Sequence, residues 1–403
     1  MKRDALGAIG AQATQAFASF VIQVLVAKSL GLDGLGTFSI LYGVIVLVTA
    51  LLTGFVGDSL VVLDRRERSI RSALEQYALG LSVLAAVICS ALAFLSGLVT
   101  LAQALLFGLA LVLFVLEEMM RRLLMANLGF WRVAAIDFTA FIGMICVVAL
   151  SVVFDDLTLG RFLLAISVGQ VVAIAFGVVF LPSEERFAVA FTTGGHRAVA
   201  VYGSWRASQQ LLRPALLTAV RTLVTIFLGL AATGLLEAGR VYVAPAMLVV
   251  SGFTSFLFVS FAKNKNARVS VQLPKADKAV WALFGITVVL GAMMVLALPI
   301  VGRVLFGTAP QLNAVLGWLA YTASVSAVTP YGALAAVGNK QAFVFGIRLT
   351  ETLVSVLAVL TMMALGADPG LVPIVLAVSS TLGGLAIRTF ILSPLARGER
   401  GPA

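Results

Sequence analysis

The chain has 403 residues, of which 61% are hydrophobic and 11% are charged, and its mean hydropathy is +1.08. Soluble domains carry roughly 25% charged residues, so this composition excludes a water-soluble globular protein. The formal net charge is +10, but the basic residues fall in short loops between apolar segments, which favours membrane orientation over nucleic-acid binding.

Apolar segments long enough to cross a bilayer, about 20 residues each, follow one another along the chain. The sequence predicts spans near 5–30, 36–62, 74–97, 100–124, 134–154, 159–181, 200–230, 237–261, 279–302, 311–336, 341–366 and 370–394. The first is interpreted as a retained helix, because many spans follow it and it lacks a small-residue cleavage site. The predicted fold class is all-α, a polytopic membrane protein of about 12 transmembrane helices.

Basic residues are distributed unequally between the two sides of these spans. With the N-terminus inside, nineteen of them lie in inner loops and only four, Lys28, Arg161, Arg240 and Arg303, lie in outer loops. The positive-inside rule therefore predicts that both termini are cytoplasmic. We expect a multi-pass protein of the inner membrane.

The two halves of the sequence repeat one another. The glycine-containing turn at 31–38 matches 234–242 at an offset of 203 residues, and a basic loop follows the next span in each half. Six spans per half give both halves the same orientation. The sequence predicts an N-lobe (1–190) and a C-lobe (191–403), each of six helices, related by a pseudo-twofold axis along the membrane normal. Such a bundle places its substrate cavity between the lobes.

The first turn also carries a family resemblance. Leu30, Gly31, Gly36 and Phe38 match the pattern A-R-x-L-G-x-x-x-x-G-x-F, with Lys28 where arginine is commoner. This segment resembles the polysaccharide flippases of the MOP superfamily (multidrug, oligosaccharidyl-lipid and polysaccharide exporters). The connection from Arg121 to Gly129, followed by Asp137, is similar to the fourth-to-fifth helix connection of that family.

The resemblance implies a transporter and not an enzyme. Its cargo would be an oligosaccharide on an undecaprenyl-pyrophosphate carrier, moved by alternating access to the outer leaflet for cell-surface polysaccharide synthesis. The implied partners are this lipid-linked glycan, the lipid bilayer, and a polysaccharide polymerase or glycosyltransferases, without nucleic acid. No cofactor is implied, and coupling to H⁺ or Na⁺ is open.

Three arginines within one predicted span are the main candidates for substrate binding. Arg206, Arg213 and Arg221 are seven and eight residues apart, which keeps them within about 80° of arc on a helix. A buried arginine costs at least ~2.5 kcal/mol at the helix centre, so these side chains should face protein or water. We expect them to bind a pyrophosphate or an acidic sugar. The alternative is that Arg206 snorkels and Arg221 lies near the outer interface.

Neutral polar side chains complete the predicted cavity. Gln209 and Gln210 are donors suited to sugar hydroxyls, and Trp205 would stack on a sugar or anchor the helix at the interface. One face of the first helix carries four polar residues, Gln12, Gln15, Ser19 and Gln23. This stripe would oppose the arginines across the lobe boundary, or instead form interhelical hydrogen bonds.

Three further charged residues are candidates for ion coupling: Asp137, Glu351 and Arg348. Arg348 and Glu351 are three residues apart, so simple pairing is the alternative, and Asp137 is within reach of Arg132 or Arg121. The run from Glu117 to Arg122 forms two i,i+4 pairs, which we expect to be a solvated structural cluster.

Other motifs give no support to an enzyme or a metal site. The GDSL letters at 57–60 lie at the end of a membrane span, and His196 has no second His or Cys nearby to complete a metal site. Two alternative functions remain open. A small-molecule or multidrug exporter should show an uncompensated acid within the membrane, and a membrane-embedded enzyme or scaffold of envelope synthesis should show a cluster of carboxylates or histidines.

Overall fold

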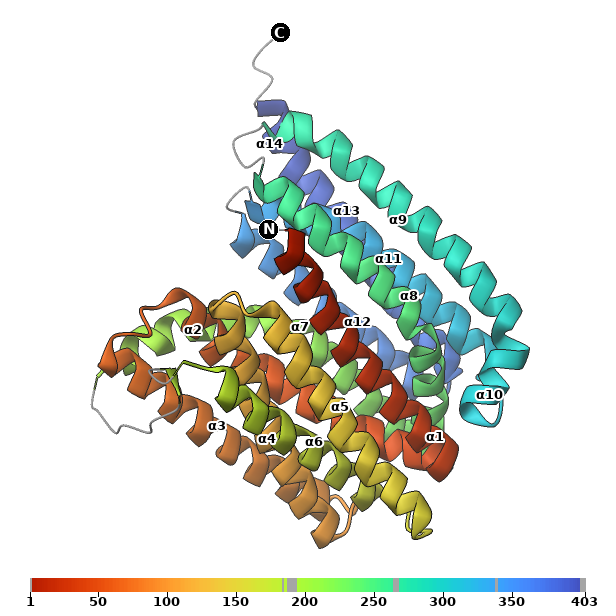
Figure 1. Cartoon of the computed structure of the whole chain (residues 1–403). Helices are drawn as coiled ribbons and strands as arrows, with labels where there is room; N and C mark the ends of the chain where they lie inside the picture. The colour runs from red at the N-terminus through yellow and green to blue at the C-terminus, as the bar shows by residue number, and fades with distance from the viewer. Residues whose placement is uncertain (1, 183–184, 187–193, 264–267, 338–339, 399–403) are drawn as a thin grey trace. The chain divides into compact units, whose positions relative to one another are not determined.

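The protein is described from a computed structural model, which covers residues 2–182, 185–186, 194–263, 268–337 and 340–398. All regular structure in these ranges is helical, without any strand (Figure 1). Eleven helices among the described residues are long and apolar enough to cross a membrane. The predicted fold class, an all-α polytopic membrane protein, is confirmed.

The first two predicted spans form one long element, which explains why eleven helices are found where twelve spans are predicted. Helix α1 (Lys2–Leu52) is interrupted at Gly31, where φ is 68° and ψ is −165°. This backbone conformation is essentially restricted to glycine. The predicted turn that begins at Gly31 is therefore too long, because helical geometry resumes directly after Gly31.

The corresponding turn of the second half lies earlier than predicted. The chain breaks at Gly229, where φ is +87°, and helix α8 begins at the next residue. Gly234 and Gly239, which the repeat assigned to a turn, lie inside α8, and so does Arg240, which was assigned to an outer loop. A single glycine with positive φ is sufficient to separate the two helices.

The chain divides into two compact units, residues 1–218 and 219–403. Their boundary falls inside helix α7 (His196–Leu228). The predicted lobe boundary at 190/191 stays a prediction.

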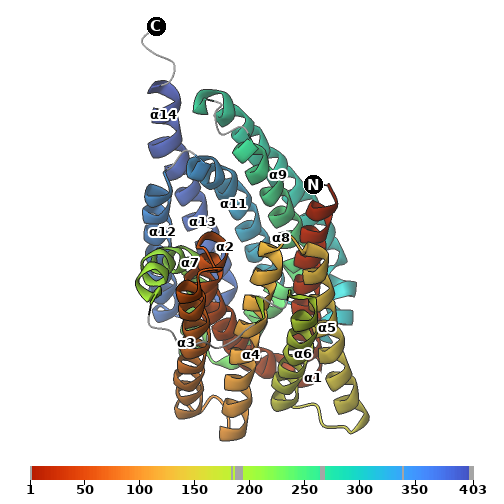
Figure 2. The same cartoon turned by 60° about the vertical axis from the view of Figure 1, so that its left-hand side comes forward.

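In unit 1, α1 continues through a π-helical segment into a short helix, and four long helices follow. These elements are η1 (Thr53–Gly57), α2 (Asp58–Val62), α3 (Arg68–Leu95), α4 (Leu101–Ala126), α5 (Phe130–Val153) and α6 (Leu159–Phe180). Helix α4 packs against α1, α3 and α6, and α5 packs against α1 and α6 (Figure 2). Thr100 and Gln103 form a capping box that begins α4.

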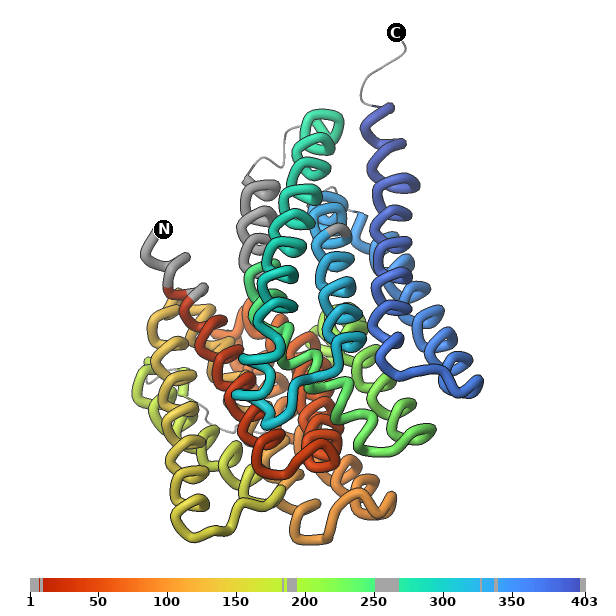
Figure 3. Tube along the Cα trace, turned by 90° about the vertical axis from the view of Figure 1, so that its right-hand side faces the viewer, coloured from red at the N-terminus to blue at the C-terminus, as the bar shows by residue number. Residues whose placement is uncertain are grey.

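Unit 2 begins within α7 and contains a second helical bundle. Its elements are α8 (Leu230–Lys263), α9 (Val269–Ala297), η3 (Leu298–Gly302), α10 (Arg303–Phe306), α11 (Leu312–Val337), α12 (Gln341–Ala364), η4 (Pro369–Leu371), α13 (Val372–Ala386), η5 (Ile387–Leu392) and α14 (Ser393–Gly398). Helix α11 packs against α8, α9 and α13 (Figure 3).

The two units share a packing pattern. Helix α4, the fourth predicted span, contacts the third and sixth spans, α3 and α6. Helix α11, the fourth span of the second half, likewise contacts its third and sixth, α9 and α13. The internal packing of each unit is thus consistent with a sequence repeat, and the pseudo-twofold axis stays a prediction.

Candidate functional site

Two glycines bring the N-terminal part of α7 into backbone contact with η1. A Cβ atom on Gly54 would lie 2.6 Å from the Cα of Ala207, and a Cβ on Gly203 would overlap the carbonyl group of Phe55. Real Cβ atoms do not approach backbone this closely, so only glycine permits this packing. The contact places Arg206 of α7 beside the start of α2.

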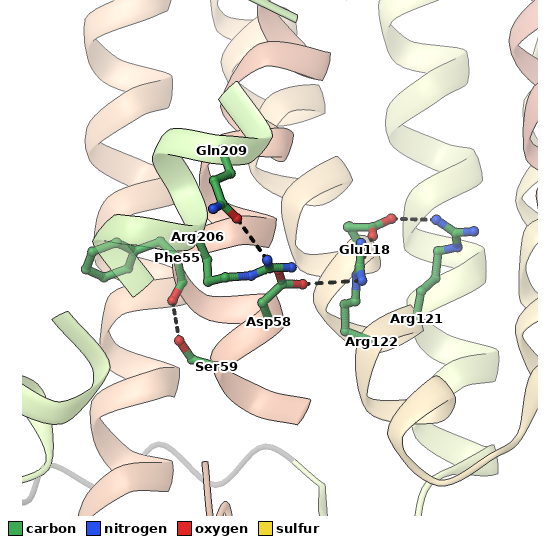
Figure 4. A network of polar contacts seen from close by, with 8 residues as sticks. All are labelled: Phe55, Asp58, Ser59, Glu118, Arg121, Arg122, Arg206 and Gln209. Atoms are coloured by element: carbon green, nitrogen blue, oxygen red, sulfur yellow. Dashed lines mark hydrogen bonds and ion pairs between the residues drawn. The ribbon is translucent and has the colours of Figure 1, made fainter. Parts of the chain in front are cut away.

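Arg206 forms an ion pair with Asp58, the first residue of α2 (Figure 4). The Nε and Nη2 atoms of Arg206 lie 2.8 and 2.6 Å from Asp58 Oδ2. A further nitrogen, Nη1, donates to Gln209 Oε1 at 2.9 Å. On its other side, Asp58 lies 3.6 Å from Arg122 Nη1 of α4. Asp58 therefore joins α2, α4 and α7.

The ion-pair network continues along α4 to α5. Arg122 donates to Glu118 at 3.0 Å, and Arg121 donates to the other oxygen of Glu118 at 2.5 Å. Arg121 Nε also lies 2.9 Å from Asp137 of α5 and 3.9 Å from Glu117. One guanidinium, that of Arg121, thus faces three carboxylates.

The α4 part of this network is buried except for Arg122, which is half-buried, and the prediction that it is a solvated cluster is wrong. Only 3% of Glu117, 6% of Glu118 and 3% of Arg121 is exposed, and Asp137 is 5% exposed. The cause is tertiary, because α1, α5 and α6 pack around α4. A carboxylate on the following span, Asp137, was the sequence signal that a buried partner existed.

Within the described part of the chain, the connected network contains one more carboxylate than guanidinium. Its four acids and three bases are Asp58, Glu117, Glu118, Asp137, Arg121, Arg122 and Arg206. The excess is located at one end, where Glu117 Oε1 and Asp137 Oδ2 are buried and accept no hydrogen bond. A buried carboxylate oxygen without a donor is costly, and a proton or a cation would stabilise it.

Glu117 and Asp137 both line a cavity of about 60 Å³ within unit 1. Further polar lining comes from Gln15 and Ser19 of α1 and Gln170 of α6. A cavity of this size holds a few water molecules but no organic cargo. Its oxygen-rich lining suits a hydrated proton or a hard cation, which prefers carboxylate and amide oxygens.

The first-helix glutamines predicted to line a substrate cavity have different surroundings. Gln15 lines the cavity described above, together with Ser19. Gln23 is buried and donates to the Ser19 carbonyl at 2.8 Å, whereas Gln12 is exposed. Their roles in substrate binding stay predictions.

Arg206 and Arg221, two of the arginines predicted to bind substrate, form ion pairs with carboxylates. Arg206 pairs with Asp58, as described, and Arg221 is buried with its Nε 2.9 Å from Glu237. Arg240 also pairs with Glu237, at 2.6 Å. Arg213 is exposed on α7. The carboxylates Asp58 and Glu237 were missing from the predicted site, and nothing local in the sequence assigns them to these arginines.

The remaining predicted residues lie at several places. Trp205 is exposed on α7, and Gln210 is half-buried there. On α12, Arg348 Nη1 lies 3.5 Å from Glu351. Asp137 pairs with Arg121 and not with Arg132, whose guanidinium donates to the Phe180 carbonyl at 3.1 Å.

The serine of the GDSL letters, Ser59, forms a hydrogen bond to the backbone of its own helix. Ser59 is fully buried, and its hydroxyl donates to the Phe55 carbonyl at 2.7 Å within the same helical segment (Figure 4). This bond occupies the hydroxyl proton, as is common for serine in membrane helices.

No family model matches the sequence, and no curated protein matches it. Solved structures match it along nearly its whole length. One, an inward-facing multidrug resistance MATE family transporter of the MOP superfamily, has a TM-score of 0.75 at 13% identity and covers 96% of both chains. An outward-facing structure of such a transporter has a TM-score of 0.67 at 12% identity, covering 99% of this chain and 96% of that one.

A third similar structure is a MOP superfamily transporter from Pyrococcus furiosus, described as having a binding pocket of reverse polarity that suggests a different function. Its TM-score is 0.63 at 12% identity, with 99% of this chain and 96% of that chain covered. At this level of identity the likenesses establish the fold. The protein is a polytopic membrane protein with a transporter fold. That fold is the one seen in MATE transporters of the MOP superfamily.

Proposed function

We propose that the protein is a secondary transporter of the MOP superfamily that exports small amphiphilic molecules in exchange for protons or sodium ions. The observation that carries this proposal is the excess carboxylate in the cavity of unit 1, at Glu117 and Asp137. An exporter of this class requires an uncompensated acid within the membrane, and intramembrane acids are typical of ion pathways.

The network offers a route from this cavity to α7. Arg121 is shared between Glu117, Glu118 and Asp137, so neutralising Glu117 or Asp137 strengthens its pairing with the remaining carboxylates. Glu118 also holds Arg122, which lies against Asp58, the partner of Arg206. A cation bound in the cavity therefore changes the electrostatic attraction between Asp58 of α2 and Arg206 of α7.

Helix α7 is a suitable element to carry this effect further, because its last residues belong to unit 2. Coupling requires that the cation bind one state of the transporter more tightly than another. A difference of about 1.4 kcal/mol between the states changes their ratio tenfold, which is within the range of one buried ion pair.

The test is export from proteoliposomes of purified protein under an imposed pH or sodium gradient, with fluorescent amphiphiles of positive, zero and negative charge. The Glu117→Gln variant should lose the dependence on the gradient. The matched control is Asp33→Asn, which neutralises an exposed carboxylate outside the network. Gradient-driven export by Glu117→Gln at the wild-type rate, or no export of any amphiphile by the wild type, would overturn the proposal.

A second candidate is a flippase for lipid-linked oligosaccharides, in the inner membrane with both termini cytoplasmic. Arg213 favours this function, because an exposed guanidinium on α7 suits a pyrophosphate group. The similar MOP superfamily transporter from Pyrococcus furiosus is described as having a binding pocket of reverse polarity that suggests a different function, which supports testing a cargo of another charge. In the same vesicles, transbilayer movement of an undecaprenyl-pyrophosphate-linked sugar, abolished by Arg213→Gln, would establish the flippase in place of the exporter.

A further inference from the structure

A second cavity in unit 1, of about 570 Å³, has a basic wall and an apolar wall. The basic wall consists of Arg65, Arg66 and Arg71, from the segment between α2 and α3 and the first turn of α3. This cavity is far larger than the one beside Glu117 and shares no lining residue with it. It lies at the end of the helices that the positive-inside rule assigns to the cytoplasm.

The basic wall is only partly neutralised. Arg65 donates to Glu185 at 3.1 Å and to Asn127 at 3.2 Å, and Arg71 donates to Glu75 at 3.0 Å. The side chain of Arg66 is exposed and forms no ion pair with the described residues. Among the described residues, the lining therefore contains three guanidiniums and two carboxylates, which leaves one positive charge to attract an anion.

The opposite wall of the cavity is apolar. It is formed by Val56, Leu60, Leu74, Ala78, Met119 and Leu123, all of which are buried. A free inorganic anion gains nothing from such a wall, because it has no apolar surface to bury. An amphiphile with an anionic head and hydrocarbon next to it would contact both walls.

We propose that this cavity binds the phosphate-bearing headgroup of an anionic phospholipid from the cytoplasmic leaflet. Arg66 contacts the phosphate, Arg65 and Arg71 form the sides of the headgroup site, and the first methylenes of the lipid pack on the apolar wall at Leu60. Basic pockets between transmembrane helices on the cytoplasmic side are suited to such headgroups. The proposed lipid site takes no part in transport, so its test is independent of the proposed function.

The experiment is native mass spectrometry of the full-length protein, titrated in detergent with phosphatidylglycerol, phosphatidylcholine or inorganic phosphate. We expect phosphatidylglycerol to bind and to be displaced neither by phosphatidylcholine nor by equimolar phosphate. Arg66→Gln should weaken binding about tenfold, the effect of losing one charge-assisted contact. Arg66→Lys, which keeps the charge, should bind within about threefold of wild type.

The control variant is Arg68→Gln, which removes the same charge from a neighbouring exposed arginine that does not line the cavity. Equal losses in Arg66→Gln and Arg68→Gln would show a general surface-charge effect and overturn the proposal. Phosphatidylcholine that binds as tightly as phosphatidylglycerol would also overturn it. Displacement of the lipid by equimolar inorganic phosphate would assign the cavity to free anions and contradict the lipid assignment.

Discussion

Arg206 and Asp58 are 148 residues apart in the sequence, and their side chains meet through two nitrogen–oxygen contacts of 2.8 and 2.6 Å. The pair is asymmetric. Asp58 is 8% exposed and faces a second arginine, Arg122, whereas a third of the Arg206 side chain is exposed. Removing Asp58 should therefore change the stability of the protein by a different amount from removing Arg206.

Asp58→Asn should destabilise the protein more than Arg206→Gln does. The first leaves Arg206 without a carboxylate and Arg122 with Glu118 alone, and breaking a buried pair costs about 3–5 kcal/mol. The second leaves Asp58 with Arg122 and removes a partly hydrated side chain, so we expect about 1–2 kcal/mol. Thermal unfolding in detergent measures both. Equal losses of stability would contradict the asymmetry of the pair.

Neutralising two adjacent carboxylates on α4 should change stability by unequal amounts. Glu118 receives hydrogen bonds from Arg121 and Arg122, so Glu118→Gln should cost about 3 kcal/mol. Glu117 lies 3.9 Å from Arg121 and has an oxygen without a donor, so Glu117→Gln should change stability by less than about 1 kcal/mol. The same unfolding assay compares the variants, and a larger loss for Glu117→Gln would refute the assignment of the excess charge.

Hydropathy was sufficient to predict the helices, because each span must be about 20 apolar residues long to cross the bilayer. It did not identify Gly31 as the point of the break, since Gly34 and Gly36 were equally good candidates and only the backbone angles separate them. The predicted arginine stripe assumed that charged side chains on one face act together. Arg206 and Arg221 instead have separate carboxylate partners, on α2 and α8.

The sequence did not predict that the charged cluster on α4 is buried. Glu117 and Arg121 are spaced like a surface i,i+4 pair, and such a pair is most often solvated. Whether it is buried depends on α1, α5 and α6, which the local spacing does not report. The partner across helices, Asp137, was predicted as an ion-coupling candidate, but its assignment to Arg121 required the structure.

In unit 2, Arg388 forms a partly exposed ion pair that its position inside a predicted span did not reveal. Its Nε and Nη2 atoms donate to Asp277 at 2.8 and 2.9 Å, and the hydroxyl group of Tyr331 donates to the same carboxylate at 2.7 Å. Arg388→Gln should cost about 1.5–3 kcal/mol, and Tyr331→Phe about 1 kcal/mol, because charged hydrogen bonds are the stronger ones.

A double-mutant cycle over Arg388→Gln and Asp277→Asn measures this pair directly. The double variant should be more stable than the sum of the single losses indicates, by about 1–2 kcal/mol, because the two side chains are in contact. Strict additivity would show that the pair contributes nothing to unit 2. Tyr331→Phe in the Asp277→Asn background should then have little further effect.

The backbone contact between α7 and η1 gives a prediction that involves no charge. Gly203→Ala would place a Cβ on the Phe55 carbonyl, so α7 must move away from η1 and carry Arg206 from Asp58. We expect a loss of about 1–3 kcal/mol, as for other overpacked interiors. Gly80→Ala is the matched control, because nothing lies within 4 Å of its Cβ position in α3 and alanine favours the helix by about 0.5–1 kcal/mol. If Gly203→Ala unfolds at the same temperature as Gly80→Ala, the close approach of α7 to η1 does not exist, and the ion pair that depends on it must be abandoned with it.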